Sequence, residues 1–214
     1  FEDSILQGFR AGRWLNGSCT QDYGSVTLMP LCGPLSFVPT SEYRGSLFSH
    51  QLEKASPDYY SVNLERYNIF AELTGLQRSG IFRFTYKTEG IGHLVIQPNS
   101  DESKGFVEID PVAQEIRGFN PVHRIYQGSG KFAGFSGFFV IKTSKPFKTF
   151  GTFNNSNLFE SQKMISDQRN CGAYVSFLMK ENEQLIVKIG TSFTSMDGAR
   201  NSLSAEINQK DFDM

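Results

Sequence analysis

Two short stretches decide the fold class: I-F-A-E-L-T at residues 69–74 and G-I-F-R-F-T-Y at residues 80–86. In the second stretch, residues alternate between two faces, as expected of a β-strand with one buried side. Phe82 and Phe84 would share one of these faces. Because only residues 75–79 separate the two stretches, the sequence predicts an antiparallel hairpin.

Similar short apolar runs, bounded by Gly, Pro and polar turn residues, recur along the whole chain. Further strands are predicted at residues 25–29, 59–64, 93–97, 106–109, 115–119, 135–143, 146–153, 173–179 and 184–193. Pro30 is expected to close the first of these, residues 154–170 to form a polar loop, and the last two runs to pair as a hairpin across residues 180–183. The fold class that follows is all-β, an antiparallel β-sandwich.

The last segment of the chain changes its period from two to that of a helix. One apolar stripe is formed by Met196, Ala199, Leu203 and Ile207, and Thr194 or Ser195 can cap the helix that carries it. We therefore expect residues 1–194 to form the sandwich domain and residues 195–214 a helical segment that could serve as a linker.

The composition agrees with an all-β domain and excludes several classes of partner. The 214 residues include 20 Phe, 20 Gly and 8 Tyr, residue types suited to pleated surfaces and turns. The 21 basic and 22 acidic residues give a net charge of −1 without a Lys/Arg tract, so no nucleic-acid or membrane-surface partner is expected. No apolar run is long enough to predict a transmembrane helix. Three Cys residues imply no disulfide framework.

The stretch most suggestive of function lies near the start of the chain. Residues 7–30 read Q-G-F-R-A-G-R-W-L-N-G-S-C-T-Q-D-Y-G-S-V-T-L-M-P and contain the only Trp, Trp14. This loop, dense in Trp, Arg, Asp and Gly, has the composition of a binding surface. The alternative is a surface turn whose Trp14 plugs an edge of the core.

Several ordered blocks of the chain resemble the N-terminal domain of the family-92 glycoside hydrolases, which are calcium-dependent exo-α-mannosidases. The blocks are G-F-R-x-x-x-W-L-x-G-S-C-T-Q-D-Y-G-S-V-T-L-M-P (residues 8–30), F-S-H-x-x-E-x-A-x-P-x-Y-Y-S-V (48–62), A-E-L-T-G-x-x-R-S-G-I-F-R-F (71–84), N-P-V-H-R-I-Y-Q-G (120–128), K-I-G-T-S-F-T-S-M-D-G-A-R (188–200) and A-E-I-x-x-x-D-F-D (205–213). Such a series of ordered blocks is far more specific than one short motif.

The resemblance implies a mutarotase-like supersandwich followed, in the parent enzyme, by a helical linker and an (α/α)6 barrel. The parent would be an inverting exo-α-mannosidase of the periplasm or a secreted enzyme. Its catalytic carboxylates and the ligands of Ca²⁺ would lie on the barrel, so no catalytic residue and no metal site are expected in this chain. Because the chain starts at Phe1 and ends just after a helical pattern, we expect a fragment of a longer protein.

The loop of residues 7–30 would then complete a mannose pocket opposite the barrel. The resemblance carries this role to Trp14, Gly17, Ser18, Cys19 and Asp22. An aromatic ring can stack on a sugar, and charged groups can bind adjacent hydroxyls, which adds Arg10 and Arg13 as candidates. The loop departs from the family where Arg13 replaces a usual His and Asn16 a usual Ser.

Two other interpretations remain open from the sequence. The chain could be a free-standing carbohydrate-binding or structural β-sandwich, without a catalytic partner. His50 and Glu53, three residues apart, could start a metal site, but a metal ion needs further ligands, and a hydrogen-bonded structural cluster is favoured. Partners expected from the resemblance are a mannose-containing glycan and the catalytic barrel of the same protein.

Overall fold

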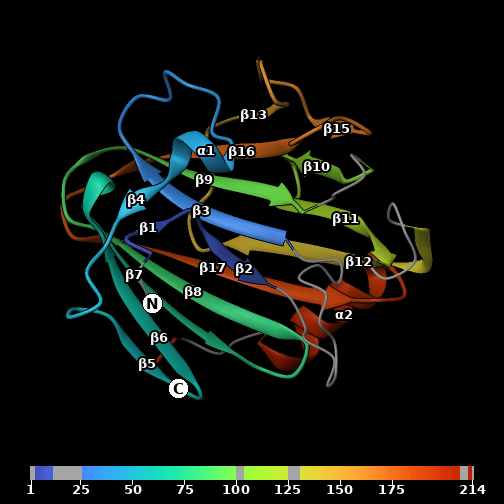
Figure 1. Cartoon of the computed structure of the whole chain (residues 1–214), viewed down its shortest axis with the longest axis horizontal. Helices are drawn as coiled ribbons and strands as arrows, with labels where there is room; N and C mark the ends of the chain where they lie inside the picture. The colour runs from blue at the N-terminus through green and yellow to red at the C-terminus, as the bar shows by residue number, and fades with distance from the viewer. Residues whose placement is uncertain (1–2, 12–25, 100–103, 125–130, 208–211, 214) are drawn as a thin grey trace.

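The computed structural model describes residues 3–11, 26–99, 104–124, 131–207 and 212–213. Two antiparallel sheets, one of nine strands and one of six, pack face to face (Figure 1). We call them the large sheet and the small sheet. The predicted antiparallel β-sandwich is confirmed.

The strand order shows that neighbours in space are often distant in the chain. The large sheet has the order β15 (Met164–Ser166), β10 (Phe106–Asp110), β11 (Glu115–Arg124), β12 (Lys131–Thr143), β17 (Glu183–Ser192), β8 (Ser79–Tyr86), β7 (Ile69–Gly75), β6 (Tyr59–Leu64) and β5 (Lys54–Ser56). The small sheet has the order β14 (Leu158–Glu160), β13 (Thr149–Phe153), β16 (Gly172–Met179), β9 (Gly90–Pro98), β3 (Val26–Cys32) and β2 (Phe9–Ala11). A separate pair joins β1 (Ile5–Leu6) to β4 (Ser46–Leu47), and the short helices are α1 (Ser41–Arg44) and the 3-10 turn η1 (Glu65–Tyr67).

The predicted hairpin β7–β8 is present, with Ala71 opposite Phe84. Phe82 and Phe84 point into the core between the sheets, where both rings lie near that of Phe9 of the small sheet. Residues of opposite parity point outward, so the alternation read from the sequence specifies the buried face correctly.

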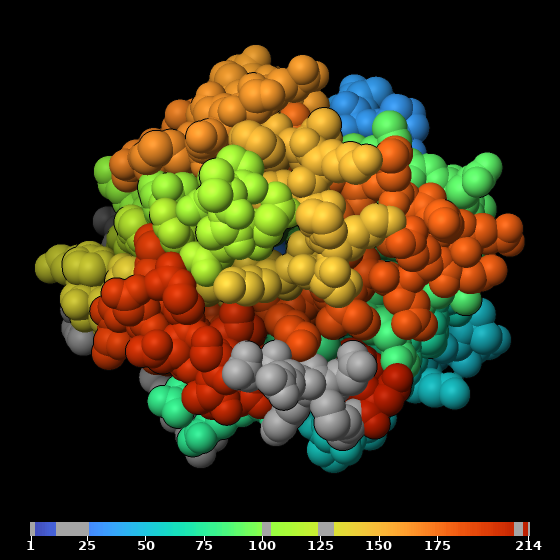
Figure 2. Space-filling model, turned by 180° about the vertical axis from the view of Figure 1, so that it is seen from behind, coloured from blue at the N-terminus to red at the C-terminus, as the bar shows by residue number. Residues whose placement is uncertain are grey.

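The C-terminal helix α2 (Met196–Glu206) packs on the outer face of the large sheet. Its Ser195 cap accepts a hydrogen bond from the Gly198 N–H at 2.9 Å, and Ala199 and Leu203 are buried against Val140. Seen from behind, α2 (red) lies on the surface of the molecule, beside the β7–β8 turn (Figure 2). No helix in the described ranges has the length and apolar character needed to cross a lipid bilayer.

The prediction that Pro30 closes the first strand is wrong, because β3 continues to Cys32. On one side, Pro30 pairs with Leu94 of β9. On the other side, β2 pairs only with residues 26–28 of β3. Pro30 therefore lies on a stretch that β2 leaves uncovered, where the missing N–H of proline removes no ladder hydrogen bond.

The predicted hairpin between residues 173–179 and 184–193 is also wrong. Both strands exist, as β16 and β17, but they belong to different sheets. The turn at residues 180–182 therefore crosses from one layer of the sandwich to the other. The supposed loop at residues 154–170 likewise contains two strands, β14 and β15, which extend the edges of the small and large sheets.

Candidate functional site

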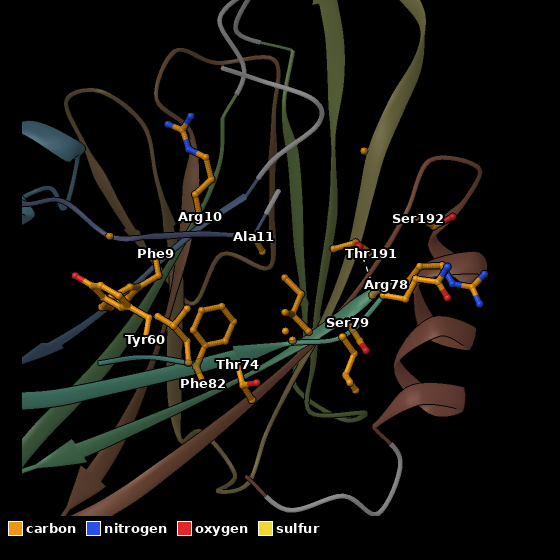
Figure 3. Close-up of a pocket in the computed structure, with 18 of the residues that line it drawn as sticks. Phe9, Arg10, Ala11, Tyr60, Thr74, Arg78, Ser79, Phe82, Thr191 and Ser192 are labelled. Atoms are coloured by element: carbon orange, nitrogen blue, oxygen red, sulfur yellow. Dashed lines mark hydrogen bonds between the residues drawn. The ribbon is translucent and has the colours of Figure 1, made fainter. Parts of the chain in front are cut away.

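A cavity of about 440 Å³ opens between β2 and the β7–β8 turn. Its wall combines residues from five separate parts of the chain. They are Leu6, residues 8–11, Tyr60, residues 73–80, Phe82, Gly137, Phe138, Ile189 and residues 191–193. We call it the β2 cavity; Figure 3 shows it in close-up.

One side of the β2 cavity is aromatic and apolar. Phe9 lies with its ring centroid 6.5 Å from that of Phe82 and 5.9 Å from that of Phe84. Tyr60 and Leu73 extend this surface. Alternation along β2 turns Phe9 into the core between the sheets, so the rings of Phe9 and Phe82 are held by packing and also line the cavity.

The other side of the cavity is polar and rigidly held. The backbone N–H of Arg78 and the Ser79 hydroxyl both donate to Glu206 Oε2, at 2.8 and 2.6 Å. The Thr191 hydroxyl donates to the Arg78 carbonyl at 3.1 Å, as drawn in Figure 3. Burial raises the pKa of Glu206, but the hydrogen bonds from Ser79 and Arg78 outweigh this and hold it below its ordinary value. Helix α2 thus fixes the turn that lines the cavity.

A series of hydrogen bonds holds the Tyr60 hydroxyl in place. The Tyr60 hydroxyl donates to Glu53 Oε2 at 2.8 Å, and His50 Nδ1 lies 2.8 Å from Glu53 Oε1. His50 Nε2 lies 2.9 Å from the carbonyl of Asp3. The hydrogen bond to Glu53 raises the pKa of His50. His50 and Glu53 therefore form the hydrogen-bonded structural cluster favoured from the sequence.

The predicted site residues lie at or beyond the edge of what the structure describes. Arg10 is on β2, and its side chain projects away from Phe9, Tyr60 and Phe82 (Figure 3). The other candidates, Arg13, Trp14, Gly17, Ser18, Cys19 and Asp22, fall in residues 12–25, outside the described residues. Of the described residues that flank this segment, Ala11 lines the cavity and Val26 is its cross-strand partner.

The wall residues of the β2 cavity can bind a ligand but offer no acid–base pair. No Asp or Glu occurs among the described wall residues, whereas an inverting glycosidase requires two carboxyl groups about 6.5–9.5 Å apart. Within the described ranges, no three His, Cys, Asp or Glu side chains are grouped to hold a metal ion. A mixed aromatic and polar wall suits a neutral polyhydroxylated ligand.

Sequence reasoning missed several residues of the cavity wall. From the sequence, residues 74–80 are assigned to the predicted hairpin, residues 191–193 and Tyr60 to predicted strands, and none of them to a site. The local signal was weak because polar turn residues such as Thr74 and Gln77 look like any solvated turn. Only the pairing of distant strands brings them beside β2.

The fold and the cavity define an antiparallel β-sandwich domain with a cavity beside the edge strand β2 of the small sheet. Comparison with protein families then gives a match to the glycosyl hydrolase family 92 N-terminal domain over residues 1–192. The chain belongs to this family. A comparison with curated protein sequences gave no match.

Solved structures of family members agree over almost the whole chain. The inverting mannosidase of family GH92 from Bacteroides thetaiotaomicron VPI-5482 superposes with a TM-score of 0.83 at 26% identity, covering 99% of this chain and 27% of that one. A GH92 α-mannosidase from the same species, in complex with mannoimidazole, gives 0.81 at 28% identity, covering 100% and 29%. A third GH92 glycosyl hydrolase, ccman5, shares the fold with a TM-score of 0.76 at 19% identity, covering 100% and 29%. The chain thus spans less than a third of each relative.

Proposed function

We propose that this chain is the substrate-facing N-terminal domain of an α-mannosidase whose catalytic carboxylates lie in another part of the same protein. The observation that carries the proposal is the agreement with two GH92 mannosidase structures, over 99% and 100% of this chain but only 27% and 29% of theirs. The remainder of such a protein has room for the acid and base that the described cavity wall lacks.

The domain would contribute binding surface for mannose. Supporting this, the β2 cavity has an aromatic side and a polar side, and Ala11, the described residue that precedes residues 12–25, lines it and pairs with Val26. Trp14, Arg13, Gly17, Ser18, Cys19 and Asp22 would complete the pocket from that segment. Arg10 would contribute from β2 itself.

The rest of the parent enzyme is proposed from the family. Residues 195–214 would lead into a helical barrel, and Ca²⁺ would be bound by that barrel rather than by this chain. A mannose-containing glycan would be the substrate, hydrolysed by the parent enzyme in the periplasm or outside the cell.

Replacing Trp14 tests the pocket role in the protein that carries this domain with its catalytic part. Trp14→Ala should lower kcat/KM for an α-mannoside about tenfold or more, because loss of a sugar–aromatic contact costs on the order of 1–2 kcal/mol. The matched control is Tyr43→Ala, since Tyr43 is 53% exposed and does not line the β2 cavity. Equal kinetics for both variants would contradict the pocket role.

Two measurements separate this proposal from a free-standing carbohydrate-binding or structural sandwich. A reading frame that ends at Met214, with no helical catalytic part encoded after it, would refute the enzyme-domain proposal. Calorimetry of the 214-residue chain should show no sub-millimolar mannose binding, because this chain would supply only part of the pocket. Sub-millimolar binding would instead favour a self-sufficient carbohydrate-binding domain.

A further inference from the structure

Strands β11 and β12 extend past both of their neighbours in the large sheet. β10 pairs only with residues 115–119 of β11, and β17 only with residues 138–143 of β12. β11 and β12 still pair with each other beyond these points, as far as Arg124 and Lys131. Within the described part of the chain, residues 121–124 and 131–136 therefore form a two-stranded projection with no third strand on either side. We call it the β11–β12 arm; its β12 strand (olive) lies at the outer edge of the molecule in Figures 1 and 2.

The arm presents aromatic side chains to its surroundings. Phe132 is 57% exposed, and its ring centroid lies 5.9 Å from that of His123, its cross-strand partner. Phe135 meets Phe193 edge to face at 5.5 Å, and both are half-buried. An exposed phenylalanine on a pair of strands that no third strand supports costs free energy in water, because a two-stranded ribbon is only marginally stable by itself.

The aromatic surface continues from the arm onto the outer face of the large sheet. Phe119 of β11 lies between Phe106 and Phe138, with ring centroids 5.3 and 5.8 Å away. All three rings are half-buried, and alternation along β11 places His123 on the same face as Phe119. Aromatic side chains that are partly exposed and adjoin one another are typical of the centre of a protein–protein interface.

The base of the arm also belongs to the wall of the β2 cavity, through Gly137, Phe138 and Phe193. A sugar bound in this cavity would need two carboxyl groups about 6.5–9.5 Å apart to be hydrolysed with inversion, and the described wall contains none. The part of the protein that supplies them must therefore come up to this wall. The arm projects beside that approach, so the same part would meet it.

We propose that the β11–β12 arm is the docking surface for the catalytic part of the same protein, an inference that rests on the proposed function. The chain covers only 27% and 29% of the two GH92 mannosidases that match it, so a parent of that length has ample further chain to cover the arm. Phe132 is buried in this contact. A second copy of this chain is a poorer occupant, because Pro121 lacks a backbone N–H and Lys131 carries a charge, two features that oppose strand pairing between copies.

Amide hydrogen exchange compares the 214-residue chain with the parent protein, which also carries the catalytic part. Residues 131–136 should exchange at least about tenfold more slowly in the parent, because a docked arm opens less often. Residues 111–113 are the internal control, since Val112 is 93% exposed in the turn between β10 and β11, outside the arm. Their exchange should be the same in both proteins.

Equal exchange of the arm in both proteins overturns the proposal. So does slowing in the 214-residue chain alone as its concentration is raised, which would identify a second copy as the occupant. Activity of the parent on an α-mannoside is measured separately. An active parent with an unprotected arm refutes the docking surface alone, whereas a protected arm in a parent without mannosidase activity refutes the proposed function alone.

A substitution shows whether Phe132 makes the contact. In the parent, Phe132→Asp should return exchange of the arm to within about threefold of its rate in the 214-residue chain, because docking would bury an unpaired carboxylate. Val112→Asp is the matched control and should leave the arm protected. Both variants of the 214-residue chain should keep a Tm within about 2 °C of the unchanged chain, since both side chains are exposed. Equal protection of the arm in the two parent variants overturns the proposal, and the comparison of the unchanged proteins decides it should Phe132→Asp fail to fold.

Discussion

At the scale of single residues, Arg83 shows how one side chain joins distant parts of the chain. Its Nε and Nη2 donate to the two carboxylate oxygens of Glu72 at 2.7 and 2.8 Å, and its Nη1 donates to Asp213 at 2.7 Å. The guanidinium also lies 4.3 Å from the centre of the Phe212 ring. The hydrogen bond from Arg83 is the largest cause that holds the pKa of Glu72 below its ordinary value.

The two carboxylates bound by Arg83 should contribute very differently to stability. Glu72 is 6% exposed, so Glu72→Gln leaves the largely buried Arg83 with only the exposed carboxylate of Asp213 as counter-charge and should lower the free energy of unfolding by about 2–4 kcal/mol. The Asp213 side chain is 77% exposed, so Asp213→Asn should change the free energy of unfolding by less than about 0.5 kcal/mol. Urea denaturation measures both, and similar losses would contradict this assignment.

At the scale of elements, helix α2 lies unusually close to strand β17. A methyl group added at Gly190 would collide with the Ala199 carbonyl and approach Leu203 Cβ to 2.7 Å. The glycine therefore permits the helix to sit directly on the sheet, where Glu206 can reach the β7–β8 turn. The wall of the β2 cavity depends on this close approach.

Adding a methyl group at Gly190 should push α2 away from the sheet. We expect Gly190→Ala to lower the free energy of unfolding by about 1–3 kcal/mol through overpacking, with faster amide hydrogen exchange in α2. Gly75→Ala is the matched control, because a methyl group there meets no atom within 4 Å. If the two variants have the same urea midpoint, the contact at Gly190 is not what positions the helix.

The elements also separate what local pattern can and cannot predict. The apolar runs of the sequence correctly predict strands β16 and β17, but the prediction that these two strands pair with each other is wrong. Alternation reports which residues of a strand are buried, but both sheets of a sandwich bury the same kind of face. The choice between a hairpin and a crossing between layers is made by packing against β9 and β8.

At the scale of the whole molecule, titration of buried groups should set the pH range of stability. His93, 6% exposed in the small sheet, has Nδ1 2.8 Å from the Ser176 hydroxyl and Nε2 2.9 Å from the Gly33 carbonyl. Burial lowers the pKa of His93. The unfolded chain therefore takes up a proton at His93 at a higher pH than the folded chain does, and protonation favours unfolding.

Stability should accordingly fall as the pH drops below about 6.5, the ordinary value for histidine. Each pH unit over which only the unfolded chain carries the extra proton costs up to about 1.4 kcal/mol. His93→Gln should flatten the dependence between pH 7.5 and 5.5. The exposed His50 has the opposite effect, because its pKa is raised in the folded chain. Its contribution to stability is present at low pH and is lost as the pH rises. His50→Gln should therefore make the loss of stability between pH 7.5 and 5.5 steeper.

Urea denaturation midpoints measured across this pH range check the prediction, and a dependence unaffected by His93→Gln would contradict it. Below about pH 4.5 a further loss is expected. Glu72, Glu115 and Glu206 have pKa values lowered in the folded state, so their stabilisation is lost as pH falls through those values.

The sequence by itself determined the fold class, the β7–β8 hairpin, the α2 stripe and the family, because alternation, helical period and ordered motifs are properties of contiguous residues. It also pointed to the loop after Ala11, although the residues that would carry the mannose contact stay a prediction. Only the tertiary structure decided the layer of each strand, the continuation of β3 through Pro30, and the β2 cavity. These depend on which distant residues meet, as Arg78 meets Glu206 while Arg44 meets only neutral groups. Burial and charge compensation are therefore set by packing and not by local pattern.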